Sequence, residues 1–163
     1  PCSVGLVCFT DNAKEKCQLS TVYEHFRDSI EDISASGGTS LFDALALAGQ
    51  SLQVWRAKQM SQESRTGLAP KLRILALSDG ADTESKMSAD NAAGFLQRAG
   101  VVVDSIIIGD AEDPNLHAIS KATGGYVFKP QSMKDALRLL ELEVVLCSVE
   151  RAPIPKLPLI PQS

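Results

Sequence analysis

Three continuous, mostly apolar runs constrain the fold of this chain more than any other feature. They occupy residues 3–9, 72–77 and 101–108, with the sequences SVGLVCF, LRILAL and VVVDSIII. A strand with one wet face alternates polar and apolar residues, whereas an unbroken apolar run is typical of a strand buried on both faces. Aromatic residues make up only 5% of the chain, so the core must be aliphatic. The runs therefore predict a largely parallel sheet whose two faces are covered.

Segments with helical spacing of apolar residues lie between these runs. We expect helices over residues 22–33, 40–55, 87–97, 115–122 and 132–145, and short strands over 16–20 and 126–128. Because strands and helices alternate, the predicted fold class is α/β: a doubly wound, mostly parallel sheet with helices on both faces. We expect one domain over residues 1–149, followed by a proline-rich tail or linker over residues 150–163.

Local signals predict where several of these helices begin and end. Thr21 and Glu24 have the spacing of a capping box at the start of the first helix. Gly100 and Gly124 follow two later helices, where glycine commonly ends a helix. Residues 58–70 are polar and contain glycine and proline, so we expect a loop there.

Composition argues against two classes of partner. The net charge is −4 and no basic stripe is present, which leaves little electrostatic support for nucleic-acid binding. No apolar run approaches the ~20 residues that a membrane-spanning helix needs. We therefore expect neither nucleic-acid binding nor membrane insertion.

The motifs of several enzyme and nucleotide-binding classes are absent. The sequence contains no G-x-G-x-x-G, no G-x-x-x-x-G-K-[ST] and no G-x-S-x-G. His25 and His117 fall on predicted helices, and neither lies near an identifiable serine or cysteine nucleophile. The expectation is a binding domain rather than an enzyme. A nucleotide-binding doubly wound domain stays open as an alternative, since it shares the fold class.

The spacing of the four cysteines gives information about metal binding and about the cellular location of the protein. Cys2, Cys8, Cys17 and Cys147 show no C-x-x-C spacing, so a zinc site is not expected. Cys8 lies in an apolar run and is interpreted as a small buried hydrophobic residue. With no N-x-S/T sequon present, free thiols and an intracellular, cytoplasmic location are favoured. An extracellular protein with a disulfide from Cys2 or Cys17 to Cys147 remains the alternative.

Two predicted loops carry oxygen ligands at one edge of the sheet. Asp79 directly follows the run at 72–77, and Thr39 ends a Gly37-Gly38-Thr39 turn just before a helix. Sites in doubly wound sheets form beyond the carboxyl ends of the strands. A carboxylate and a hydroxyl there suit Mg²⁺, Mn²⁺ or Ca²⁺. The alternative is that S-D-G is an ordinary turn and Thr39 an ordinary helix cap.

Three further acidic residues lie near these loops or strands. Asp82 and Glu84 follow Asp79 closely and are interpreted as solvated side chains. Asp104 interrupts the apolar run at 101–108. A buried carboxylate costs several kcal/mol unless it is paired, so we expect Asp104 to meet a polar partner.

Five segments, taken in order, resemble the von Willebrand factor type A (vWA) domain. They are VGLVCFTD at 4–11, SGGTSLFDAL at 36–45, LRILALSDGADT at 72–83, VVVDSIIIGD at 101–110 and LHAISKATGGYVFKP at 116–130. The likeness covers about nine tenths of the chain. Each segment alone is a weak signal, whereas five in the right order are a strong one.

The resemblance implies a protein-binding module with a metal-ion-dependent adhesion site. In the family this site combines an Asp-x-Ser-x-Ser motif after the first strand, a threonine in a second loop and an aspartate after a later strand. The matching positions here are Thr39 and Asp79. A carboxylate of the protein ligand would complete the oxygen shell of Mg²⁺, Mn²⁺ or Ca²⁺.

The D-x-S-x-S motif occurs nowhere in the 163 residues. Residues 4–9 resemble the family's second strand, so the resemblance implies a first strand and helix upstream of Pro1 and an N-terminally incomplete fold. We expect metal binding only when that upstream motif is present. A second possibility is a scaffold or targeting domain of a multidomain enzyme, such as one of the ubiquitin pathway.

Overall fold

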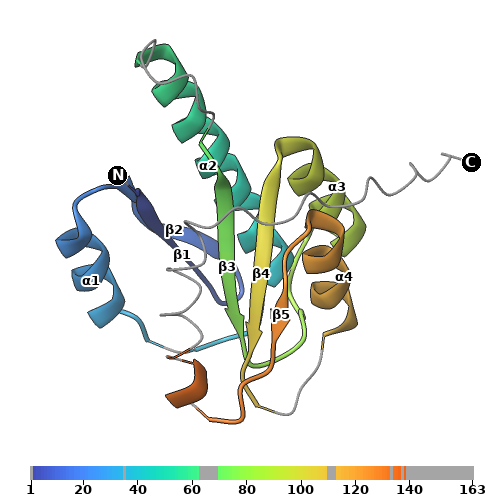
Figure 1. The fold of residues 1–163 in the computed structure, drawn as a ribbon. Helices are drawn as coiled ribbons and strands as arrows, with labels where there is room; N and C mark the ends of the chain where they lie inside the picture. Colours follow the sequence, from blue (N-terminus) through green and yellow to red (C-terminus); the bar gives the residue numbers. More distant parts are fainter. Residues whose placement is uncertain are drawn as a thin grey trace, which may run out of the picture.

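The computed structural model describes residues 2–34, 36–62, 70–109, 113–132, 134–136 and 138. Figure 1 shows the arrangement of the helices and strands. In chain order they are β1 (Val4–Phe9), β2 (Ala13–Ser20), α1 (Tyr23–Glu31), α2 (Leu41–Gln62), β3 (Leu72–Ser78), α3 (Ala89–Ala99), β4 (Val101–Ile107), α4 (Pro114–Thr123) and β5 (Val127–Phe128).

The strands form two separate sheets within this described part. Strands β3, β4 and β5 make a parallel sheet in that order, with Leu72 opposite Val101 and Ser78 opposite Ile107. Strands β1 and β2 make a second, antiparallel sheet. The predicted α/β fold with a parallel sheet flanked by helices is confirmed. The short strand expected at 16–20 begins earlier, at Ala13, because the chain reverses tightly after β1 and both strands pair along their length.

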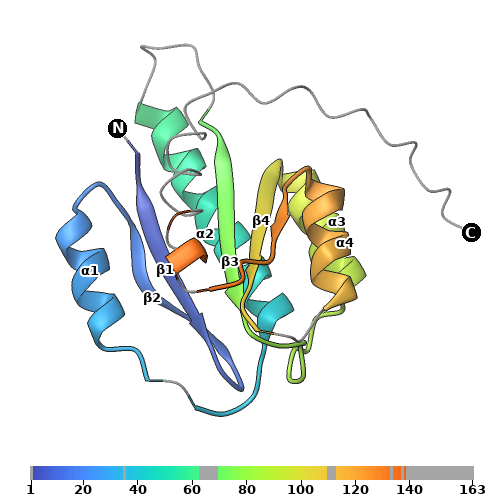
Figure 2. The same ribbon diagram turned by 60° about the horizontal axis from the view of Figure 1, so that its bottom comes forward.

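The main core lies between the parallel sheet and helices α2, α3 and α4. Its fully buried side chains include Leu41 on α2, Leu96 on α3, Leu116 on α4 and Val103 on β4. Burial of each such side chain contributes roughly 1.5–3 kcal/mol. Helix α2 contacts strands of both sheets (Figure 2) and so joins them on this face.

Helix boundaries confirm some of the local signals and correct others. Gly100 and Gly124 end α3 and α4 with φ of 66° and 80°, as predicted. The expected capping box is wrong: Val22 is the N-cap of α1 and makes no side-chain cap bond. Ser20 Oγ instead accepts from the Val22 amide at 3.0 Å, so this hydroxyl closes the turn into α1.

The loop predicted at residues 58–70 begins too early, because α2 continues to Gln62. Residues 58–62 (KQMSQ) are mostly good helix formers, and no glycine or proline occurs before Gly67. The predicted helix at 132–145 is described only at 134–136 and 138, which are helical. The rest of that helix and the tail at 150–163 lie outside the described residues. Among the described helices, none has the length and apolarity needed to cross a membrane.

Candidate functional site

Three loops meet at the carboxyl edge of the strands: the loop after β1, the loop before α2 and the loop after β3. In the first loop, Asp11 Oδ1 accepts a hydrogen bond from the Gly38 amide at 2.6 Å. Gly37 has φ of 77°, and a Cβ there would lie 2.7 Å from Asp11 Oδ1. The turn before α2 can therefore pack on Asp11 only if this position is glycine. The sequence prediction missed Asp11, although its place at the end of an apolar run was the available signal.

Thr39 is bound through its backbone to the loop after β3. Its amide donates to Thr83 Oγ1 at 3.0 Å, and its carbonyl accepts from the Thr83 and Glu84 amides at 2.9 and 3.1 Å. That loop begins with Asp79, which is exposed. The structure thus places the two predicted metal ligands, Thr39 and Asp79, on two loops that are hydrogen-bonded to each other.

Asp82 is not a solvated side chain, and that prediction is wrong. Its Oδ1 accepts hydrogen bonds from the amides of Leu41 and Phe42 at 2.7 and 3.2 Å and from Ser85 Oγ. Ser85 Oγ also accepts from the amides of Phe42 and Asp43, at 2.9 and 3.1 Å. These amides are the first of α2, which have no partner inside their own helix. A carboxylate there also interacts favourably with the positive end of the helix dipole.

Asp43 makes the reverse connection, from α2 to the loop after β3. Its carboxylate accepts from the amides of Lys86 and Met87 at 3.0 and 2.9 Å. Loop and helix therefore satisfy each other's backbone donors. The side-chain and backbone bonds of Thr39, Asp43, Asp82, Thr83 and Ser85 together form a loop–helix network.

Asp113 extends this arrangement to α4. It is buried, and its carboxylate caps α4 by accepting from the amides of Asn115 and Leu116 at 2.8 and 3.3 Å. Its other oxygen accepts from the Asp82 amide at 3.2 Å. An aspartate directly before proline at a helix start was a usable sequence signal for this cap. The loop after β3 is thus held by both α2 and α4.

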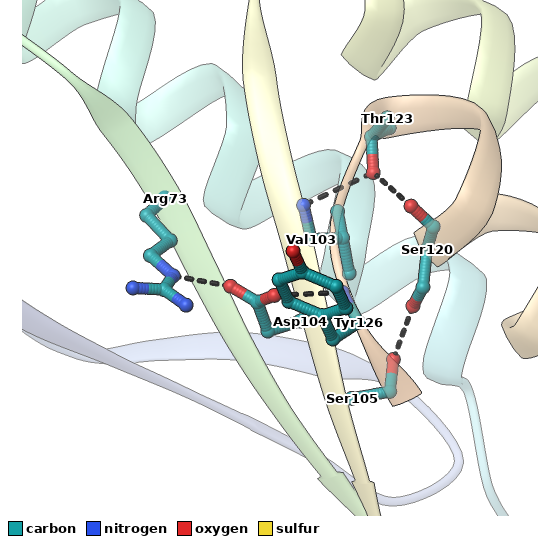
Figure 3. A network of polar contacts seen from close by, with 7 residues as sticks. All are labelled: Arg73, Val103, Asp104, Ser105, Ser120, Thr123 and Tyr126. Atoms are coloured by element: carbon teal, nitrogen blue, oxygen red, sulfur yellow. Dashed lines mark hydrogen bonds and ion pairs between the residues drawn. The ribbon is translucent and has the colours of Figure 1, made fainter. Parts of the chain in front are cut away.

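Asp104 has the polar partners that the sequence predicted. Figure 3 shows its buried carboxylate bound to the guanidinium of Arg73, and its other oxygen accepts from the Tyr126 amide at 2.8 Å. Ser105 and Ser120 join β4 to α4 through their hydroxyls, 2.6 Å apart. Asp104 lies inside the sheet, and its bonds link β3 to the β5 segment. Its role is therefore structural rather than catalytic.

Cys2, Cys8 and Cys17 carry free thiols, and the fourth cysteine lies outside the described residues. Cys17 is buried, whereas Cys8 is only half-buried, so the interpretation of Cys8 as fully buried is too strong. Burial raises the pKa of the Cys8 thiol, and the nearby charge of Lys16 opposes that effect. The Cys8 thiol is therefore a weak nucleophile.

The donor set at the carboxyl edge fits a hard cation only in part. The Thr39 hydroxyl and the Asp79 carboxylate are the oxygen ligands that such ions prefer. No group of three or more His, Cys, Asp or Glu side chains in the described part of the chain could hold a metal ion. His25 and His117 are both exposed on helices, as expected. These residues thus supply too few ligands for a complete metal site.

Comparisons with known proteins identify relatives in sequence and in fold. A probable bifunctional E2/E3 enzyme of Acanthamoeba polyphaga mimivirus is 34% identical over 152 residues, which is 93% of this chain and 11% of the viral protein. The chain therefore spans about a tenth of that relative's length. A vWA structure from Catenulispora acidiphila has a TM-score of 0.68 at 22% identity, covering 86% of this chain and 32% of the other.

A mussel byssus protein, proximal thread matrix protein 1, has also been solved with a zinc-occupied metal-ion-dependent adhesion site. It has a TM-score of 0.63 at 20% identity, covering 89% of this chain and 34% of the mussel chain. These structural likenesses establish the fold. Residues 2–142 match the von Willebrand factor type A family itself. The chain belongs to the von Willebrand factor type A domain family.

Proposed function

We propose that this chain is a protein-interaction module whose contact site is the carboxyl edge built from the loops of Thr39 and Asp79. The observation that carries the proposal is the hydrogen bonding of these two loops to each other, which fixes the threonine beside the loop that carries the aspartate. A carboxylate on the protein ligand would be recognised through a divalent cation held there. The module binds and does not catalyse.

Two observations support Thr39 and Asp79 as the metal ligands of this proposal. Asp79 is exposed, and no hydrogen bond or ion pair holds its carboxylate within the described residues. Thr39 keeps its hydroxyl available because the bonds to the neighbouring loop use its amide and carbonyl. Mg²⁺ is the favoured ion, with Mn²⁺ or Ca²⁺ as the other hard cations that oxygen ligands suit. A complete site would also need an Asp-x-Ser-x-Ser motif, which the 163 residues do not contain.

Thermal unfolding with Mg²⁺ and with EDTA tests the proposal. The comparison is between residues 1–163 and the natural polypeptide extended upstream. We expect Mg²⁺ at about 100 times its Kd to add ~2.7 kcal/mol to the extended form. That corresponds to a rise in Tm of about 5–10 °C. Asp79→Ala should abolish the rise, whereas Asp28→Ala, at an exposed position on α1, should leave it intact. No response to Mg²⁺ in the extended form would refute the metal-dependent site.

A second candidate function is a targeting or scaffold domain of a multidomain enzyme. The observation in its favour is the 34% identity to a viral protein named as a probable E2/E3 enzyme. In that case deletion of residues 1–149 from the full polypeptide would leave conjugation chemistry intact and change the choice of substrate. A thioester formed with ubiquitin by residues 1–163 alone would contradict both candidates.

The free thiols suit an intracellular location, which cell fractionation would test.

A further inference from the structure

The turn that carries Thr39 is held on the side of β1 by the hairpin that joins β1 to β2. Asp11 is the middle residue of the connection between these strands, which spans residues 10–12. Phe9, at the end of β1, packs against the main core and pairs with Ala13 across the hairpin. Figure 2 shows this hairpin turn beside the segment that leads into α2. The position of Asp11 is therefore set by the two strands that flank it.

The Asp11 carboxylate contacts the backbone of the turn at two successive residues. Its Oδ1 accepts a hydrogen bond from the Gly38 amide at 2.6 Å, a short distance that is typical of a charged acceptor. A Cβ at Gly37 would lie 2.7, 3.1 and 3.2 Å from Oδ1, Cγ and Oδ2 of the same carboxylate. No ion pair within the described part of the chain involves this carboxylate. Its contacts with the described residues are therefore those with the turn.

Gly38 passes between the side chains of two different loops. A Cβ at this position would lie 3.2 Å from Asp11 Oδ1, in the loop after β1. It would lie 2.3 Å from Glu84 Cγ, in the loop after β3, which is closer than a Cβ can approach. A side chain here would displace one of the two loops, so glycine allows the turn to lie between them.

The backbone on both sides of Thr39 is bonded to these same two loops. On the side of β1, the Gly38 amide donates to Asp11 and the Ser40 amide donates to the Thr10 carbonyl at 2.8 Å. On the side of β3, the amide and carbonyl of Thr39 itself are bonded to the neighbouring loop. These bonds fix the backbone at Thr39 and leave its hydroxyl for a ligand.

We propose that Asp11 is a positioning residue of the binding edge. It holds Thr39 in place through the Gly38 amide, without contacting the ligand itself. Because the turn is already ordered, a ligand does not have to order it on binding, and this raises affinity. The inference rests on the proposed function, since the position of Thr39 affects binding only if this edge binds a ligand.

Amide hydrogen exchange followed by NMR in metal-free buffer tests the position of Thr39 separately from metal binding. In Asp11→Ala the Gly38 amide loses its acceptor, so the amides of Gly38 and Thr39 should exchange at least about 10-fold faster. Asp11→Asn keeps an oxygen acceptor, so its exchange should stay within about threefold of the unsubstituted protein. The Leu41 amide, which Asp82 holds, is the internal reference and should not change.

Glu15→Ala is the matched control, because Glu15 is an exposed acid on β2 of the same hairpin. It should leave exchange at Gly38 unchanged. Equal exchange at Gly38 in Asp11→Ala and Glu15→Ala would overturn the proposal. An increase at Leu41 as large as that at Gly38 would also overturn it, because Asp11 would then act on overall stability and not on the turn.

A double-mutant cycle with Gly37 gives an independent readout. Gly37→Ala should lower the Tm by at least about 5 °C, because the residue has φ of 77° and its Cβ would meet the Asp11 carboxylate. In the Asp11→Ala background this carboxylate is missing, so the same substitution should lower the Tm by at least about 2 °C less. An equal fall in both backgrounds would show that the turn does not rest on Asp11 and would refute the proposal.

Mn²⁺ binding by the full natural polypeptide, followed by electron paramagnetic resonance, connects this role to the proposed function. We expect Asp11→Ala to weaken Mn²⁺ binding at least about fivefold and Asp11→Asn to weaken it less than about twofold. Equal affinity in the unsubstituted protein and in Asp11→Ala would overturn the role of Asp11 in binding. If no form bound Mn²⁺ while exchange at Thr39 still depended on Asp11, the metal-dependent site would be refuted and the positioning of Thr39 by Asp11 would stand.

Discussion

Replacement of Asp82 is expected to destabilise the start of α2 and the loop that carries Asp79. In Asp82→Ala the Leu41 amide loses its hydrogen-bond acceptor, while the Phe42 amide keeps Ser85 Oγ. Loss of a side-chain cap costs about 1 kcal/mol, within a range of roughly 0.5–2. Loss of the carboxylate from the positive end of the helix dipole adds about 0.3–1 kcal/mol. The free energy of unfolding should therefore fall by about 1–3 kcal/mol.

Urea unfolding followed by circular dichroism in EDTA measures this loss without any contribution from metal. Asp82→Asn keeps an oxygen acceptor and loses only the charge, so we expect a loss of about 1 kcal/mol or less. Glu84→Ala is the matched control, because Glu84 is exposed and bonds to Thr39 through its backbone amide. It should change stability by less than about 0.5 kcal/mol. The reasoning fails if Asp82→Ala is no more destabilising than Glu84→Ala.

Two further predictions concern a close backbone contact and a thiol. Gly125→Ala would place a Cβ 1.9 Å from the Val103 carbonyl oxygen, so the free energy of unfolding should fall by about 3 kcal/mol or more. In the control Gly80→Ala the new Cβ meets nothing within 4 Å, so stability should not change. Thermal unfolding should therefore show a lower Tm for Gly125→Ala only. The folded-state pKa of Cys8 lies above its ordinary 9.0, so the unfolded chain loses this proton first and the free energy of unfolding should fall as pH rises above about 9. Urea unfolding at several pH values should show that the free energy of unfolding falls less steeply with pH in Cys8→Ala than in the unsubstituted chain. An equal dependence on pH in both would contradict the raised pKa of Cys8.

The elements that depend on hydrophobic patterning were predictable from the sequence. The runs at residues 72–77 and 101–108 are strands because their side chains face a core on one or both sides, and no local signal competes with that pattern. The ends of α3 and α4 were also predictable, since glycine at a left-handed position is a local requirement. The edge that carries Thr39 and Asp79 followed from topology, because carboxyl ends of parallel strands share an edge.

Partners that are distant in sequence were not predictable. Asp82 looked like a solvated acid because the helix amides that it caps, those of Leu41 and Phe42 on α2, lie 41 and 40 residues away in the sequence. Thr21 matched a capping pattern, but α1 begins one residue later with Val22 as its N-cap, and the Ser20 hydroxyl accepts from the Val22 amide instead. The pattern on α1 correctly marked an apolar side at Ile30, yet periodicity does not show whether anything covers that side.

The loop–helix network has a consequence for how the domain folds. The side-chain bonds that join its two segments, residues 39–43 and 82–87, link residues 40 to 44 positions apart in the sequence. Contacts of such long sequence separation require closure of a large chain loop before they return any energy. We therefore expect the edge to assemble after α2 has docked on β3. A nascent chain that has been synthesised only as far as the end of α2 contains Thr39 but not the loop after β3, so it has no binding edge. Ligand binding would therefore occur only after this loop has been synthesised and has folded against α2.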